Sequence, residues 1–557
     1  MMDLRVNQTA HGSVLVLRTE MFTMKIPKFG PPLPRMSASM GWLGSIIALS
    51  AALLAALVMV FAPVSPLSLG SAAAAGSQSA PLDGDFNLAR AESFLSTGAG
   101  QQDSTPEVDN LVYLPSVKLS QRIFLPIINR YQPPRQSVFG VEINSGIDHS
   151  LAGQAAEAGA TWVRYGAIRW DQIESIQGQR NWSLLADFDR NLAVLQAQGL
   201  RTSIVVLGAP TWAQRRPPWM CGAMREDALD DFASFMQALV RRYSGPPYYV
   251  KYWELGNEPD VDPSYVGPDS GFGCWGDQSD PYYGGADYAT MLKTVYPAIK
   301  AVDPQAQVMT GGLLMDCDPT HPPADSQDGC RSGKFFEGIL RGGGAPYFDI
   351  VAYHAYSHWN DHGLDDDLTH FKWSARGGAL LGKASLLREV MARYGVNKPL
   401  LMNEGGLLCY PTNPVCPGNA FRHGQAVGLI KLYARTWANH IDGAIWYTLN
   451  GPGWREGGLL ESDKTPRPAY TSMRFMSSLL RQARFTKSIS TAQMEGYEFE
   501  DNTFIYRLYW TNNASLTVQI PVTIDIQTVY NAYGQIRTTG GSTIPVSFDP
   551  VVLVLRK

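Results

Sequence analysis

Short apolar segments with strand character alternate with amphipathic helical segments between residues 137 and 447, and this alternation is the strongest constraint on the fold. The helical segments include 152–159, 227–243 and 384–394. The strand-like segments are 139–143, 162–165, 202–207, 249–253, 307–310, 348–353, 400–402 and 443–447. Eight strands in roughly 310 residues, with helices between them, predict a (β/α)8 barrel, which we place at 134–478.

The pattern changes after Leu480, where the helical signal stops. Residues 504–510, 516–520 and 551–555 are strand-like and are separated by Asn-Asn and Gly-Gly turns. These features predict a small C-terminal β-sandwich domain over 479–557.

The first 75 residues contain an uncharged apolar segment, 41–63, that is long enough to span a bilayer, with basic residues before it. A cleaved signal peptide and a retained membrane anchor both fit this segment, and the sequence does not choose between them. Either one places the rest of the chain outside the cytoplasm, as a secreted or surface-anchored protein. Residues 76–133 are rich in Ser, Gly, Ala, Gln, Asp and Pro and read as a linker.

The charge and the cysteines narrow the class of protein further. The net charge is −4, and Lys and Arg are dispersed, so no nucleic-acid partner is expected. The six cysteines are an even number in an exported chain, which favours disulfides over a zinc site, because no Cys-x-x-Cys pair exists. Cys317 with Cys330 and Cys409 with Cys416 are the local pairs, leaving Cys221 with Cys274. The sequence gives no indication of oligomeric state.

Two glutamates follow apolar, strand-like runs. Asn257-Glu258-Pro259 comes after the run that ends near Trp253, and Pro259 prevents the strand from continuing. Glu404 is expected to be the last residue of its strand, before a break at Gly405-Gly406. In a parallel barrel these positions lie on the face that carries the chemistry, so a pair of carboxylates is predicted there.

Further residues carry a resemblance to a known group of enzymes. Arg164, Asn257-Glu258-Pro259, His354-Ala355-Tyr356, Glu404 and Trp446 stand in order at strands two, four, six, seven and eight. This arrangement resembles the clan A glycoside hydrolases, in particular families such as 39, 5 and 51, over residues 137–480.

The resemblance implies a retaining glycoside hydrolase that cleaves O-glycosidic bonds of a plant or microbial polysaccharide or oligosaccharide, without a metal or other cofactor. Glu258 would be the acid/base and Glu404 the nucleophile. Carbohydrate-binding roles are expected for Arg164, Asn257, His354, Tyr356 and Trp446, with Trp446 as a flat face for the sugar ring. Trp212, which follows the third strand, and Trp454 are further stacking candidates, and Glu142 is a candidate for binding a hydroxyl.

A non-catalytic glycan-binding surface protein built on the same barrel is the alternative. A degenerate binder usually loses one of the two glutamates, whereas both are present here. The sugar, the linkage and the choice between exo and endo action stay open. The acidic run Asp365-Asp366-Asp367 lacks the ligand spacing of a calcium loop and is expected to be a solvated turn.

Overall fold

The computed structural model describes residues 8–9, 12–13, 137–144, 147–326, 328–410, 412–413, 415–538 and 540–557. The chain divides into two units, 1–122 and 123–557, and the described part of the first is a pair of two-residue strands, β1 (Gln8–Thr9) and β2 (Gly12–Ser13). The apolar segment 41–63 and the predicted linker 76–133 lie outside the described residues. Within the described part of the chain, no helix has both the length and the hydrophobicity needed to cross a membrane.

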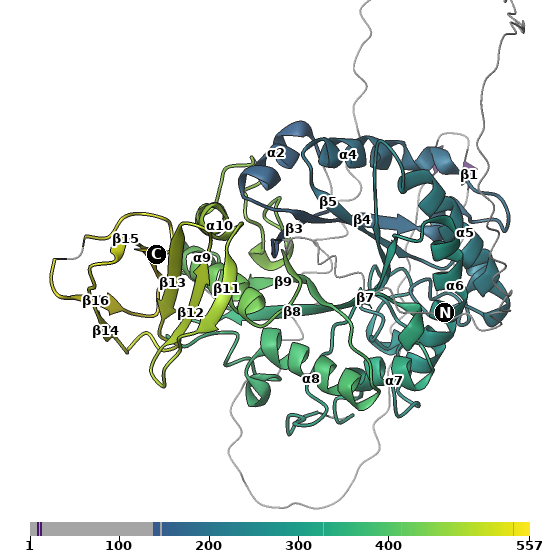
Figure 1. The fold of residues 1–557 in the computed structure, drawn as a ribbon. Helices are drawn as coiled ribbons and strands as arrows, with labels where there is room; N and C mark the ends of the chain where they lie inside the picture. The colour runs from purple at the N-terminus through teal and green to yellow at the C-terminus, as the bar shows by residue number, and fades with distance from the viewer. Residues whose placement is uncertain are drawn as a thin grey trace, which may run out of the picture. The chain divides into compact units, whose positions relative to one another are not determined.

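The second unit begins with a closed parallel barrel (Figure 1). Its strands are β3 (Phe139–Ile143), β4 (Trp162–Arg169), β5 (Arg201–Leu207), β6 (Tyr252–Asn257), β7 (Gln307–Gly312), β8 (Val351–Trp359), β9 (Leu400–Cys409) and β10 (Gly443–Trp446). They follow the order β7-β6-β5-β4-β3-β10-β9-β8, and bridges from Met309 to Ile350 and from Leu313 to Tyr353 join the two edge strands. The predicted fold class is confirmed.

Helices alternate with these strands and form the outer layer of the barrel (Figure 1). They are α2 (His149–Glu157), α3 (Trp170–Ile173), α4 (Ala186–Ala197), α5 (Leu229–Tyr243), α6 (Gly285–Val302), α7 (Phe335–Arg341), α8 (Ala379–Arg393), α9 (Asn419–Ala438) and α10 (Pro468–Leu480). These helices pack on the barrel through an apolar face, as in α5, which buries Phe232, Phe235, Met236 and Leu239 on one side.

The barrel interior changes from apolar to charged along the strand direction. Its lower part is a buried cluster of Trp162, Met309, Ile350, Ala352, Leu401 and Ile445. Side chains two residues apart on a strand share a face, so Arg164 follows Trp162 and His354 follows Ala352 towards the carboxyl ends of the strands. The apolar layer therefore forms the floor on which the polar residues rest.

Strand β9 does not end at Glu404, contrary to the sequence prediction; it continues through Gly405-Gly406 to Cys409. The glycines allow close packing inside the strand: a Cβ on Gly405 would lie 2.3 Å from the carbonyl oxygen of Ala355. The register between β8 and β9 also shifts, because Met402 pairs with Tyr353 and Glu404 with His354. Asn403 is thus an extra residue, and this bulge turns Glu404 towards the barrel mouth.

Two antiparallel sheets follow the barrel. The first has the order β11-β12-β13-β17-β15 and the second pairs β14 with β16. The strands are β11 (Arg484–Ser488), β12 (Glu495–Glu500), β13 (Phe504–Trp510), β14 (Val518–Pro521), β15 (Ile526–Tyr530), β16 (Thr543–Val546) and β17 (Val551–Arg556). Ile544 and Val546 of the small sheet share one buried cluster with Val551 and Leu553 of the large one, which is the layered core expected of a small sandwich.

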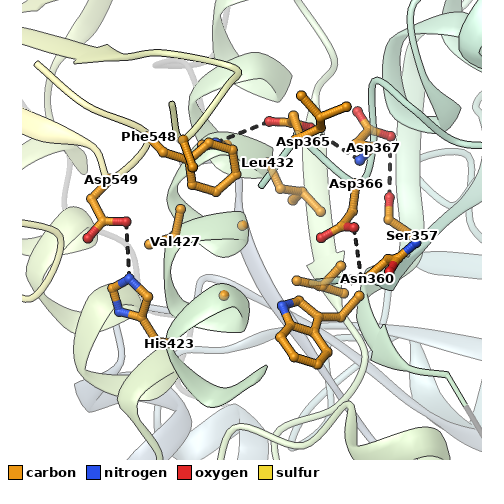
Figure 2. Close-up of a pocket in the computed structure, with 18 of the residues that line it drawn as sticks. Ser357, Asn360, Asp365, Asp366, Asp367, His423, Val427, Leu432, Phe548 and Asp549 are labelled. Carbon is orange, nitrogen blue, oxygen red and sulfur yellow. Dashed lines mark hydrogen bonds and ion pairs between the residues drawn. The ribbon is translucent and has the colours of Figure 1, made fainter. Parts of the chain in front are cut away.

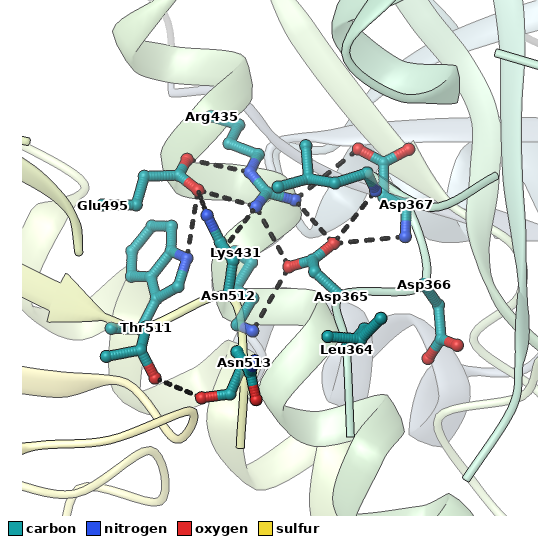
Figure 3. Close-up of polar contacts among 12 residues, drawn as sticks. Leu364, Asp365, Asp366, Asp367, Lys431, Arg435, Glu495, Thr511, Asn512 and Asn513 are labelled. Atoms are coloured by element: carbon teal, nitrogen blue, oxygen red, sulfur yellow. Dashed lines mark hydrogen bonds and ion pairs between the residues drawn. The ribbon is translucent and has the colours of Figure 1, made fainter. Parts of the chain in front are cut away.

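A buried ion-pair network joins the barrel to the C-terminal sheets (Figure 3). Arg435 of α9 lies 3.0 Å from Asp365 Oδ2 and 2.7 Å from Glu495 Oε2 of β12, and Lys431 lies 3.2 Å from Asp365 Oδ2. Burial opposes the charge on Asp365, but the two cations outweigh it and hold the pKa of Asp365 well below its ordinary value. The acidic run is therefore not the solvated turn expected from the sequence, because Asp365 is buried within this network.

We predict that Arg435→Gln lowers the free energy of unfolding by roughly 3–5 kcal/mol, since it removes the cation that Asp365 and Glu495 share and leaves Lys431 to compensate Asp365. Urea unfolding of the full chain measures this loss. The matched control is Arg484→Gln, whose pair with Glu500 is at the surface, and we expect it to behave like the wild type. Equal effects of the two substitutions would contradict a stabilising role for the network.

Candidate active site

Glu258 and Glu404 face each other across the mouth of the barrel. Glu258 directly follows β6, and its backbone N–H donates to the carbonyl of Gly312 at 2.9 Å. The backbone φ of Glu258 is +49°, so the chain turns sharply there. One carboxylate oxygen of Glu258 and one of Glu404 lie within 4.8 Å of each other, with a ring nitrogen of His354 inside the same distance.

Glu404 is held by two donors. Arg164 Nη1 donates to Oε2 at 2.6 Å, and the hydroxyl of Tyr356 donates to Oε1. Burial alone would raise the pKa of Glu404, but the charges of His354 and Arg164 and the Tyr356 hydrogen bond more than offset it and lower the pKa. This carboxylate is therefore kept ionised.

Arg164 is the centre of the polar cluster. In addition to Glu404 it reaches Glu142 at 2.9 Å, both oxygens of Glu254 at 2.9 and 3.0 Å, and Asn257 Oδ1 at 2.6 Å. Burial works against its charge, but the nearby carboxylates raise the pKa of Arg164 well above its ordinary value. A charged guanidinium on β4 thus orients groups from three other strands, β3, β6 and β9.

His354 lies between the two glutamates. Its Nδ1 is 2.8 Å from Glu258 Oε1 and its Nε2 is 3.6 Å from Glu404 Oε2. Burial lowers the pKa of this imidazole, whereas the negative charges of Glu404 and Glu258 raise it, and the net shift is upward. The ring therefore responds to the charge of both carboxylates.

The pKa of Glu142 is shifted in the opposite direction to that of Glu404. Burial raises its pKa to about 8, against the attraction of Arg164 and with the repulsion of Glu404 adding to the rise. The upward shift favours the protonated form of Glu142 in the folded protein. Glu254 is also fully buried, and both of its oxygens accept hydrogen bonds from Arg164. Its part in the cluster was not anticipated from the sequence, although it lies in the same strand as Asn257.

The cluster opens into a cleft of about 680 Å³. Four aromatic side chains line it together with the polar residues: Phe272, Tyr356, Tyr447 and Trp454. Phe272 is 50% exposed and Trp454 is 49% exposed, so both present ring faces to solvent, and the Trp454 ring lies edge-on to Tyr356 at 5.7 Å. Large, partly exposed rings beside convergent polar groups are typical of a ligand site.

The structure brings together Arg164, Asn257, Glu258, His354, Tyr356 and Glu404, but it leaves the predicted Trp446 and Trp212 outside the cleft. Trp446 is fully buried, and its Nε1–H donates to the carbonyl of Gly457, which contradicts a role as an open sugar platform. The cause is strand alternation: Ile445 faces the barrel interior, so Trp446 points outward and Tyr447 enters the cleft. Trp212 donates to the carbonyl of Glu174 and packs edge-on against Trp170.

All six cysteines are paired as the sequence predicts, in disulfides Cys221–Cys274, Cys317–Cys330 and Cys409–Cys416. The first joins the loop after β5 to the loop after β6, only two residues from Phe272. The cross-link therefore restrains the loop that supplies one aromatic wall of the cleft.

Glu258, His354 and Glu404 are also close enough to offer three ligand atoms to a metal ion. However, both oxygens of Glu404 already accept strong hydrogen bonds, one of them from the Arg164 cation at 2.6 Å. A divalent cation would be repelled by that guanidinium, so the donor set suits a metal poorly.

A second cavity of about 310 Å³ lies on the outer side of β8 and β9 (Figure 2). Trp446, Ser357 and Asp367 line it from the barrel, and Phe548 and Asp549 line it from the C-terminal sheets. Several of its acidic groups make structural contacts, for example Asp549 with His423 at 3.0 Å and Asp365 with Arg435 at 3.0 Å. It is separate from the cleft that contains Glu258 and Glu404.

Comparison with known proteins gives structural relatives only. No family model matches the sequence, and no curated protein matches it either. The fold is similar to a solved family 39 glycoside hydrolase from Bacteroides cellulosilyticus WH2, at 20% identity and TM-score 0.57 over 76% of this chain and 82% of that one.

Two further solved structures share the fold. A family 30 subfamily 8 xylanase from Clostridium acetobutylicum matches at 12% identity and TM-score 0.50, over 75% of this chain and 96% of the xylanase. A conserved exported protein from Bacteroides fragilis matches at 11% identity and TM-score 0.52, over 76% of this chain and 99% of that chain. The resemblance seen in the sequence is thus confirmed at the level of the fold, which this chain shares with glycoside hydrolases.

Proposed function

We propose that this chain is a retaining glycoside hydrolase with Glu404 as the nucleophile and Glu258 as the acid/base. The observation that carries the proposal is the pair of carboxylates whose oxygens approach within 4.8 Å at one cleft, with Glu404 kept ionised by Arg164 and Tyr356. Retaining enzymes hold their two carboxyl groups about 5 Å apart, whereas inverting enzymes leave room for a water molecule between them.

In the proposed mechanism each of the two glutamates has a separate role. An oxygen of Glu404 attacks the anomeric carbon as the bond to the leaving oxygen breaks, and Glu258 gives its proton to that oxygen. In the second step Glu258 takes a proton from water, whose oxygen attacks the anomeric carbon and releases Glu404. Asn257 already directs Oδ1 at Arg164, so its NH2 group is the part that would donate to a sugar hydroxyl.

The substrate we propose is a plant or microbial polysaccharide or oligosaccharide, and the protein would act outside the cytoplasm. The three disulfides support the location, because such bonds persist in oxidising compartments. A screen of aryl glycosides and plant polysaccharides would identify the sugar. A folded protein that binds glycans and hydrolyses none of them would instead be the non-catalytic binder.

Glu404→Gln is expected to lower kcat by more than about a thousandfold on any substrate from that screen, because the amide cannot form the glycosyl-enzyme. Steady-state rates and circular dichroism measure the loss and the fold. The matched control, Glu157→Gln, changes an exposed glutamate on α2 and should keep wild-type rates. Residual activity above a hundredth of wild type would remove Glu404 from the nucleophile role.

Glu258→Ala should fail on substrates with basic leaving groups but still form the intermediate from an activated aryl glycoside, where no acid is needed. The second step then stalls without a base, and added azide, which needs none, restores turnover. After two inversions the glycosyl azide carries the substrate's own anomeric configuration, which proton NMR reads. An inverted azide, or no rescue of a folded variant, would rule out this assignment.

Glu142 gives a prediction about pH. Its folded-state pKa of about 8 lies above the ordinary 4.5, so the folded chain binds this proton more tightly than the unfolded chain. The resulting stability is lost as pH rises from about 4.5 to about 8, by up to about 1.4 kcal/mol per pH unit. Glu142→Gln should remove that part of the dependence, as measured by urea unfolding between these pH values.

The same titration should affect catalysis, since ionised Glu142 competes with Glu404 for Arg164. We expect the alkaline limb of kcat/KM to move to higher pH in Glu142→Gln, and Glu157→Gln to keep the wild-type profile. Identical stability slopes in the wild type and Glu142→Gln would show that Glu142 is not the proton-binding group.

A further inference from the structure

A separate cavity of about 660 Å³ lies beside the cleft, between the loop that follows β8 and the residues that follow β9. His358, Asn360, Asp361, Asp366, His370, Phe371 and Tyr410 are among the residues that line it. None of them belongs to the polar cluster around Arg164. The cavity is as large as the cleft itself, which has about 680 Å³.

The two cavities lie along one strand. Tyr356 and His358 share a face of β8, because they are two residues apart, so His358 lies about 7 Å further towards the barrel mouth. Arg455 contacts one residue of each lining: its Nη1 donates to His358 Nε2 at 2.8 Å, and its guanidinium lies 4.5 Å from the ring centroid of Trp454. The 660 Å³ cavity and the cleft are therefore neighbours, with linings linked through Arg455.

The lining combines exposed rings with polar groups, among them two neutral imidazoles. Tyr410 is 47% exposed and Phe371 is 69% exposed, although neither is needed to cover the barrel core. His358 lies edge-on to Tyr410 at 5.4 Å, and His370 stacks on Phe371 at 5.2 Å, so the imidazoles support the rings. Burial lowers the pKa of His358 to about 4 and that of His370 to about 3, and both rings are neutral at neutral pH.

Such a lining matches the two surfaces of a sugar. The C–H face of a pyranose packs on an aromatic ring, and its hydroxyls bond to neutral imidazoles, amides and carboxylates. The carboxylate of Asp361 lines the same cavity and disfavours an anionic sugar unit, whereas burial raises the pKa of Asp366 to about 7. The chemistry thus selects an uncharged carbohydrate.

We propose that this cavity binds uncharged sugar units of the substrate next to the unit that is cleaved, with Tyr410 and Phe371 as the stacking faces. The inference rests on the proposed function and deepens it, because it makes the substrate an oligosaccharide or polysaccharide rather than a glycoside with a small aglycone. Binding energy from the non-reacting units would then hold the scissile bond at Glu258 and Glu404.

The test uses the full chain carrying Glu404→Gln, so that binding is read without hydrolysis. Isothermal titration calorimetry compares xylotetraose, cellotetraose and mannotetraose with xylose, glucose and mannose. We expect at least one tetraose to bind ten or more times more tightly than its monosaccharide. Tyr410→Ala and Phe371→Ala should each reduce that ratio by about tenfold, the usual scale for removing an aromatic anchor.

Tyr249→Ala is the matched control, since Tyr249 is 53% exposed and precedes β6 at the opposite end of the barrel. It should keep the full ratio. Because Tyr410 and Phe371 are exposed, thermal unfolding should show intact folds for both variants, and either variant alone suffices for the test. A ratio that persists in both variants, or no tetraose that binds more tightly than its monosaccharide, overturns the inference.

Hydrolysis of aryl glycosides by the wild type shows whether the proposed sugar site or the proposed glycosidase function is the one that is wrong. Cleavage without any gain for tetraoses leaves the glycosidase proposal standing and sinks the second sugar site. A chain-length gain that depends on Tyr410, without cleavage of any substrate, has the opposite meaning: it supports the site and rejects the glycosidase.

Discussion

A single buried cation, Arg164, decides how the upper part of the barrel is arranged. A guanidinium removed from water is tolerated only where its charge and its N–H groups are satisfied, and here Glu142, Glu254, Glu404 and Asn257 provide this compensation from β3, β6 and β9. The barrel makes this possible, because parallel strands bring their carboxyl ends to one face. The apolar floor below Arg164 excludes water from the other side.

The charge balance of the cluster separates otherwise similar carboxyl groups. One cation cannot keep every nearby carboxylate ionised, so Glu404 has a lowered pKa while Glu142 has a raised one. The pKa of His354 also depends on this balance, because the charge on Glu404 is the largest contribution that raises it. In the proposed mechanism, a sugar ester on Glu404 would remove that contribution, so the imidazole would hold its proton less tightly in the intermediate than in the free protein.

The sequence predicted the eight strands because they depend on a local signal, apolar alternation, and it placed Glu258 correctly because Pro259 follows it. It located Glu404 at the barrel mouth although the strand end expected at Gly405-Gly406 was wrong. It failed where the answer depends on register. Trp446 and Tyr447 are neighbours, and only the inward position of Ile445 shows that Tyr447 is the one facing the cleft. The bulge at Asn403 is likewise a property of the pairing between β8 and β9, and no pattern within either strand reveals it.

The acidic run after β8 shows how a distant contact can shape the site. Asp365 is anchored by Arg435, which Glu495 of the C-terminal sheets also binds. The next residue, Asp366, accepts a hydrogen bond from the backbone N–H of Asn360 at 3.0 Å, and both of these residues line the cavity with Tyr410. The loop that carries His370 and Phe371 continues from this anchored run. The C-terminal part of the chain also bonds this loop directly, because Asp365 N–H donates to the carbonyl of Asn512 at 3.3 Å and Ala514 N–H donates to the carbonyl of Gly363 at 2.7 Å. The C-terminal sheets therefore hold the loop at the mouth of the barrel through Arg435 and through backbone hydrogen bonds, and in the sugar site proposed above their contribution would be to fix this loop.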